Sequence, residues 1–292
     1  MLPPALECAE TVFFEFESVS DGEAHCLEKP RGHSRPFYEL PGGEASYFQD
    51  TDQLYLGCGD RVRAICHPGA GSAFFSVIES EAENLWLASH LLFTISLIEI
   101  LKRRGCYSLH AAGFGANGRG ILIPGMSRAG KSTLAIALLR AKFDYLSDDM
   151  LFLSRRDDGL RVLAFPEELD VTDETLGFFP ELSFVSRSPK VRGWPKRQVH
   201  PEEVFGVKAS HEAFPAAVVL PRIANTEASI LTRIHPDEAL LEIAPNVLLT
   251  DEPSCRAHLH ALAELVRLTP CYRLETGRDF DRLPILFREL LV

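Results

Sequence analysis

Residues 120–133 read GILIPGMSRAGKST, and this stretch decides the fold that the sequence predicts. It places a G-x-x-x-x-G-K-S pattern at 125–132, after a short apolar run and before a stretch with helical periodicity. We expect a strand at 120–123, a glycine-rich loop, a helix at 131–141 and a second strand at 143–146. This order of elements is typical of an α/β fold.

The loop has the chemistry of a phosphate-binding site. Gly125 and Gly130 permit backbone angles that side chains forbid, so successive N–H groups can surround phosphate oxygens at the positive end of the following helix. Lys131 would reach the β- and γ-phosphates of a nucleotide, and Ser132 would bind Mg²⁺. The pattern thus predicts ATP and Mg²⁺ as cofactors. The nucleotide would contact Gly125, Met126, Ser127, Arg128, Ala129, Gly130, Lys131, Ser132 and Thr133. The alternative is a turn that merely needs two glycines, but a turn gains nothing from the Lys-Ser pair.

Two adjacent carboxylates, Asp148 and Asp149, follow the strand expected at 143–146. Active sites of α/β proteins collect at the carboxyl ends of strands. Neighbouring side chains on an extended backbone point in opposite directions, so we expect one to hold the metal and the other to accept a proton. Asp-Asp is also a common pair in surface turns, and the preceding loop is what favours the functional interpretation.

Two further features leave alternatives open. His110 lies in the segment SLHAA, and a lone histidine in an apolar segment is more often a hydrogen-bonded core residue than a catalytic one. A run of cations at 187–197 either recognises phosphates or an acidic substrate, or is a solvated loop. Its members are Arg187, Lys190, Arg192, Lys196 and Arg197.

Composition excludes several classes of protein. A chain of 292 residues with 46% hydrophobic residues can bury a core of one large domain or two small ones. The net charge of -11 argues against a nucleic-acid binder, which would carry a basic face. Seven scattered cysteines without a C-x-x-C pair indicate neither a disulfide framework nor a zinc site, and a reducing cytoplasm fits best.

Targeting and membrane signals are also weak in the sequence. The N-terminus has no positive charge followed by an apolar run, so we expect no signal peptide. The apolar stretch at 85–101 approaches membrane-spanning length but contains His90, Thr94, Ser96 and Glu99. We expect a buried helix there, and no membrane partner.

The rest of the chain divides by its periodicity. Residues 1–80 alternate short apolar runs with Gly, Pro and Asp, so we expect a β-rich portion with strands at 11–16, 53–56, 62–66 and 73–78. A helix is expected at 81–104 and the core of the second domain at 105–292. Within it we expect strands at 150–154, 160–165, 216–220 and 228–234, and helices after Pro236, at 256–268 and near 283–291. The stretch from 166 to about 213 is poorly periodic and long for a loop, which is typical of a functional segment.

Three segments together resemble the HPr kinase family: LHAA at 109–112, the loop at 125–133 and LSDD at 146–149. The resemblance is strongest over residues 105–155. It implies a P-loop kinase domain at 81–292 with the phosphoenolpyruvate-carboxykinase-like fold of the HPr kinase C-terminal domain. It further implies that His110 assists catalysis and that Asp148 is the base toward a serine hydroxyl, which leaves Asp149 with Ser132 at the metal.

The positions at which this sequence differs from HPr kinases bear on the identity of the phosphoryl acceptor. HPr kinases usually carry Asp and Gly where this chain has Met126 and Arg128, and Glu where it has Thr133. The chain looks closer to HPr-kinase-like proteins encoded with peptide-modification pathways, which phosphorylate serine on a peptide. The implied function is transfer of the γ-phosphoryl group of ATP to a peptide or protein serine, with Asp148, His110 and Lys131 as catalytic residues. A small-molecule hydroxyl kinase and a non-catalytic, regulatory nucleotide-binding module remain alternatives, and homo-oligomerisation is left open.

Overall fold

The computed structural model describes residues 11–20, 27–81, 86–125, 129–165, 167–187, 190, 196–224 and 226–292. The chain is a mixed α/β protein with two compact units. One unit comprises Met1–Arg104 with Leu248–Cys255, and the other comprises Gly105–Val247 with Arg256–Val292. The division therefore falls after Arg104, whereas the sequence placed it near residue 80.

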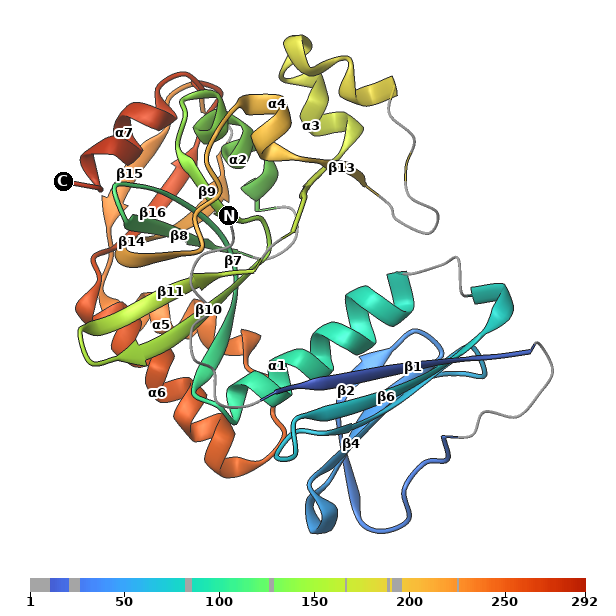
Figure 1. Ribbon diagram of the computed structural model, residues 1–292. Coiled ribbons are helices and arrows are strands. Elements are labelled where there is room, and N and C mark those ends of the chain that lie inside the picture. Colours follow the sequence, from blue (N-terminus) through green and yellow to red (C-terminus); the bar gives the residue numbers. More distant parts are fainter. Residues whose placement is uncertain are drawn as a thin grey trace. The chain divides into compact units, whose positions relative to one another are not determined.

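The first unit is built on a six-stranded sheet with the order β1-β6-β5-β4-β3-β2 (Figure 1). Its strands are β1 (Phe13–Val19), β2 (Ser34–Leu40), β3 (Gly43–Phe48), β4 (Gln53–Cys58), β5 (Val62–His67) and β6 (Ser72–Ile78). Two short 3-10 turns, η1 (Gln49–Thr51) and η2 (Glu79–Glu81), belong to the same unit. Strand β1 is parallel to β6, and every other neighbouring pair is antiparallel. Strands β2 and β3 were not expected, because their sequences lack a clear apolar alternation.

The helix expected at 81–104 is present in its described part as two segments. A π-helical segment, η3 (Trp86–Phe93), continues into α1 (Thr94–Lys102). Leu92, Ile95 and Ile100 are buried in one apolar cluster with the strands, which explains why this segment belongs to the first unit. No helix in the described part of the chain is long and apolar enough to cross a membrane.

A buried ionic cluster ties Leu248–Cys255 to the first unit. The Nζ of Lys102, whose side chain is fully buried, lies 2.6 Å from Glu99 Oε1 and 3.0 Å from the hydroxyl of Thr250. Arg103 contacts the other oxygen of Glu99 at 2.9 Å. Because the charged groups satisfy one another, the cost of removing them from water is offset by their mutual attraction and hydrogen bonds.

The second unit is built on an eight-stranded sheet. Its order is β11-β10-β7-β8-β14-β16-β15, with β9 also paired to β7. The strands are β7 (Cys106–Ala116), β8 (Arg119–Pro124), β9 (Asp144–Ser147), β10 (Met150–Arg156), β11 (Gly159–Ala164), β14 (Glu212–Ile223), β15 (Ile230–Arg233) and β16 (Cys271–Thr276). Strands β8, β14 and β16 run parallel, and β7 is antiparallel to β8, β9 and β10.

Helices cover both faces of the parallel strands. Helices α2 (Lys131–Arg140) and α7 (Leu283–Glu289) lie above them in Figure 1, whereas α5 (Pro236–Ile243) and α6 (Glu252–Leu268) lie below. The poorly periodic stretch folds into short elements around a two-stranded ribbon of β12 and β13. These elements are β12 (Leu169–Val171), α3 (Asp173–Gly177), η4 (Pro180–Leu182), η5 (Val185–Arg187), β13 (Arg197–Val199) and α4 (Pro201–Phe205), and η6 (Ala244–Asn246) follows α5.

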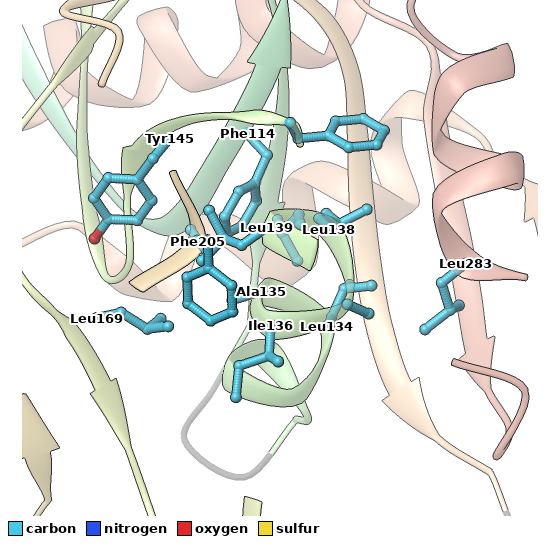
Figure 2. Packing of buried hydrophobic residues seen from close by; sticks show 14 of the residues in the cluster. Phe114, Leu134, Ala135, Ile136, Leu138, Leu139, Tyr145, Leu169, Phe205 and Leu283 are labelled. Atoms are coloured by element: carbon cyan, nitrogen blue, oxygen red, sulfur yellow. The ribbon is translucent and has the colours of Figure 1, made fainter. Parts of the chain in front are cut away.

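Helix α2 lies at the centre of the core of this unit. Every residue from Leu134 to Leu139 is at most 2% exposed. Figure 2 shows these side chains among Phe114 of β7, Phe205 of α4 and Leu283 of α7. A helix that is apolar on all sides is stable only when it is buried on all sides, and this packing fixes the position of the N-terminus of α2 within the unit.

The ionic cluster of the first unit generates a stability prediction. Lys102→Met should lower the free energy of unfolding by about 3–5 kcal/mol, because it leaves Glu99 buried without its ammonium partner. The control is Lys29→Met, which removes an exposed ion pair with Glu44 and should cost less than about 1 kcal/mol. Urea unfolding of both variants measures the difference. Equal losses in the two would show that the cluster does not stabilise the unit.

Candidate functional site

Strand β7 places His110 beside the acidic pair. His110 is paired with Met150 of β10 in antiparallel register, and the N–H of Ala111 donates to the carbonyl of Asp149 at 3.0 Å. As a result, Asp149 Oδ1 lies 3.0 Å from His110 Nε2. Both side chains are partly exposed, at 43% for the histidine and 39% for the aspartate, so they are accessible to a ligand.

Lys131, the first residue of α2, joins these two groups. Its Nζ lies 2.9 Å from His110 Nε2 and 3.4 Å from Asp149 Oδ1, and it donates to the carbonyl of Gly125 at 2.5 Å. One imidazole nitrogen cannot accept from Lys131 and donate to Asp149 at once, so the proton on His110 decides which bond forms. The structure thus brings together three of the sequence-predicted residues from three separate segments.

The described part of the glycine-rich loop fits a nucleotide phosphate. A Cβ on Gly125 would lie 3.2 Å from the Cβ of Ala129 and 3.4 Å from the Cγ of Pro221, and Gly130 has φ +93°. The positive φ favours glycine at position 130, whereas at position 125 an added Cβ would be crowded but no positive φ demands glycine. In such loops, phosphate is bound by the helix N-terminus and by the lysine ammonium, here α2 and Lys131. Mg²⁺ is bound by the hydroxyl oxygen of the residue after the lysine, here Ser132.

Some sequence-predicted residues have no described position or no contact with the site. Ser132 and Thr133 are partly exposed in the first turn of α2, and Arg187 is exposed at the end of η5. Four others lie outside the described residues: Met126, Ser127, Arg128 and Arg192. Their expected roles stay predictions.

The two aspartates of the pair lie in different environments. Asp148 is 4% exposed, and its Oδ2 accepts the N–H of Asp170 at 3.0 Å. Burial raises the pKa of Asp148 to about 8. Burial also opposes ionisation of Asp149, but the hydrogen bond to His110 and the charge of Lys131 hold its pKa well below the ordinary value. Near neutral pH, Asp149 is therefore a carboxylate, whereas Asp148 is largely a carboxylic acid.

Glu167 is a site residue that the sequence did not reveal. Its Oε1 accepts the hydroxyl of Ser147 at 2.5 Å and the backbone N–H groups of Asp148, Asp149 and Met150 at 3.1, 2.7 and 3.1 Å. It belongs to no motif. One feature of the sequence could have indicated Glu167: it is a carboxylate shortly after the end of a strand, where the active sites of α/β proteins collect.

The basic run is largely paired with carboxylates of its own segment. Lys190 and Arg197 contact Asp173 at 3.5 and 2.8 Å, and Lys196 lies 3.8 Å from Asp170. Lys196 also acts on the acidic pair, because its positive charge lowers the pKa of both Asp148 and Asp149. Substrate recognition by the run stays a prediction.

Comparison with known proteins adds a distant structural likeness. No family model matches the chain, and no curated protein matches it. Among solved structures, the Hpr(Ser) kinase/phosphatase from Coxiella burnetii is similar at 13% sequence identity and a TM-score of 0.35. The match covers 63% of this chain and 92% of the other. At this level of similarity, neither the detailed fold nor the activity of that protein transfers to this chain.

The raised pKa of Asp148 generates a prediction about stability and pH. The native protein keeps a proton that the unfolded chain releases between about pH 4 and about pH 8, so the contribution of Asp148 to stability is lost as pH rises through this window. Asp148→Asn cannot ionise. In the absence of Mg²⁺, its free energy of unfolding should therefore rise relative to wild type, by on the order of a few kcal/mol at about pH 8.

Urea unfolding at about pH 5 and about pH 8 measures this effect. Asp157→Asn, in the exposed turn between β10 and β11, is the control and should follow the wild-type pH dependence. If the free energy of unfolding changes with pH by the same amount in Asp148→Asn and in wild type, the Asp148 carboxyl is not held in its protonated form.

Proposed function

We propose that this chain binds ATP with Mg²⁺ and transfers the γ-phosphoryl group to a serine hydroxyl of a peptide or protein, on a phosphoenolpyruvate-carboxykinase-like P-loop fold. One observation carries the proposal. The Lys131 ammonium lies within 3.4 Å of His110 Nε2, of Asp149 Oδ1 and of the carbonyl of Gly125. Phosphoryl transfer is catalysed by a cation at the phosphates and a carboxylate near the metal, and a neighbouring imidazole can add proton transfer.

On the phosphate side, Lys131 would exchange its bonds within the protein for the β- and γ-phosphates. Ser132 and Asp149 would hold Mg²⁺, which neutralises charge on the phosphate oxygens when it is bound. Asp149 suits this role because it is ionised and partly exposed. The N-terminus of α2 is the positive end of the helix dipole and would attract the phosphates, and burial of the helix keeps that end in place.

On the acceptor side, Asp148 is the proposed base. A carboxyl whose pKa lies near the working pH takes a proton from a hydroxyl more readily than an ordinary aspartate. Its Oδ2 accepts the N–H of Asp170, and the acceptor hydroxyl would approach another lone pair of the same carboxyl. His110, between Lys131 and Asp149, would assist by moving a proton or by holding the transferred group.

The phosphate side is tested by Lys131→Ala. This variant should abolish ATP turnover and weaken ATP-Mg²⁺ binding at least about tenfold, because it removes the ammonium from the loop. Calorimetric titration with ATP-Mg²⁺ and a turnover assay measure both quantities. Lys208→Ala removes an exposed lysine outside the loop and should behave as wild type. Wild-type affinity and turnover in Lys131→Ala would refute nucleotide binding at this loop.

The two aspartates are separated by paired variants. Asp148→Asn keeps the hydrogen bond to Asp170 but cannot accept a proton, so it should bind ATP-Mg²⁺ normally and lose about a hundredfold or more in transfer rate. Asp149→Asn should lose both nucleotide affinity and Mg²⁺ dependence, because a metal ligand acts in the ground state as well. Titration and single-turnover transfer, measured for each variant, give the comparison. The reverse pattern would make Asp149 the base.

The acceptor is found by labelling. Incubation of the protein with γ-labelled ATP and an extract of its source cell, followed by identification of the labelled product, distinguishes the proposed reaction from its alternatives. Label on a serine of a peptide or protein supports the proposal. Label on a small molecule would assign the chain to another kinase class, and nucleotide binding without transfer to any acceptor would indicate a regulatory module.

A further inference from the structure

The turn at 147–150, between β9 and β10, is organised around a single oxygen atom. Four donors converge on Glu167 Oε1: the hydroxyl of Ser147 and three successive backbone N–H groups. Three consecutive N–H groups that point to one side form a concave anion site, and here a side chain of the protein fills it. The direction of both aspartate side chains depends on this backbone.

The segment that carries Glu167 is itself fixed against the turn. The hydroxyl of Tyr145, which is 4% exposed, donates to the carbonyl of Glu167 at 3.0 Å. The hydroxyl oxygen of Ser147 also lies 3.1 Å from the carbonyl oxygen of Phe165, and the N–H of Asp170 donates to Asp148 at 3.0 Å. Phe165, Glu167 and Asp170 therefore all lie against the turn.

An acid at this position has an electrostatic cost. Glu167 lies close enough to Asp149 to be repelled by it, and burial raises the pKa of the Glu167 carboxyl. Its hydrogen bonds to Ser147 and to the turn offset these effects. The geometry that Glu167 imposes on the turn explains the presence of an acid beside two others, since a carboxylate oxygen can accept several hydrogen bonds at once.

We propose that Glu167 is a positioning residue for phosphoryl transfer, which fixes the turn at 147–150 so that Asp149 faces Lys131 and His110 while Asp148 faces β12. This proposal rests on the proposed function. Glu167 acts through the backbone of the aspartates and touches neither the Lys131 ammonium nor His110 in the described contacts. Displacement of a reacting group by about 1 Å lowers the rate on the order of a hundredfold. Loss of the hydrogen bonds from the turn to Glu167 should therefore slow the phosphoryl-transfer step.

The test uses four full-length proteins: wild type, Glu167→Ala, Glu167→Gln and Glu168→Ala. Glu167→Ala removes the acceptor, and Glu167→Gln keeps one oxygen at the same reach. Glu168→Ala removes the neighbouring acid, which makes no hydrogen bond to the turn among the described contacts. Each protein is measured for ATP-Mg²⁺ affinity, for KM and kcat with γ-labelled ATP and water as the acceptor, and for the amide proton shifts of Asp148, Asp149 and Met150.

Glu167→Ala should move the three amide resonances upfield, because a hydrogen bond to a carboxylate holds them downfield. Its kcat should fall by about a hundredfold, and its ATP-Mg²⁺ affinity should fall by a smaller factor, because Asp149, the proposed metal ligand, is no longer held in place. Glu167→Gln should recover kcat to within about tenfold of wild type, and Glu168→Ala should match wild type in every readout. If Glu167→Ala does not fold, Glu167→Gln tests the proposal by itself. Its three amide shifts should differ from those of wild type, and its kcat should lie below that of wild type without being abolished.

Two failures are distinguishable. If wild type binds and turns over ATP-Mg²⁺ and Glu167→Ala has the kcat of Glu168→Ala, the positioning role is refuted and the proposed function stands. If the amide resonances do not move, Glu167 does not hold the turn. If wild type neither binds nor turns over ATP-Mg²⁺, the proposed function is refuted, together with the catalytic part of this proposal.

Discussion

Strand β7 is hydrogen-bonded along both edges, and the candidate site depends on this pairing. On one side β7 pairs with β8, which leads directly into the glycine-rich loop. On the other side it pairs with β10 and β9, which flank the acidic pair. The loop and the acids, separated along the chain, are therefore held on either side of His110. A shift in register by one residue would turn His110 to the opposite face of the sheet.

Burial of α2 supplies the second constraint. The N-terminus of a helix can bind phosphate only if it stays in place, and an isolated helix of this length is marginal in water. Here the helix is enclosed by β7, α4 and α7, as Figure 2 shows. The elements around it come from distant parts of the sequence, so the N-terminus of α2 is held by the whole unit and not by local propensity.

Electrostatic asymmetry follows from these two constraints. Two identical side chains, adjacent in sequence, differ in protonation because Asp149 faces Lys131 and His110 whereas Asp148 is buried. The overall charge of -11 does not determine this, since the few cations that matter are local. The buried cluster of Lys102 and Glu99 shows the same principle in the first unit, where charges are retained inside because each has a partner.

The sequence by itself determined what depends on neighbours along the chain. The glycines and the Lys-Ser pair at 130–132 predict a phosphate loop, periodicity located β8 and α2, and the alternation of an extended backbone predicted that Asp148 and Asp149 diverge. The tertiary structure alone decided which aspartate faces Lys131, that Glu167 holds their turn, and that Leu248–Cys255 belongs to the first unit. It also revealed β2, β3 and β16, whose apolar residues follow no clear period. The physical reason is that periodicity records only which face of an element is buried, whereas sheet register and long-range hydrogen bonds decide what lies opposite that face.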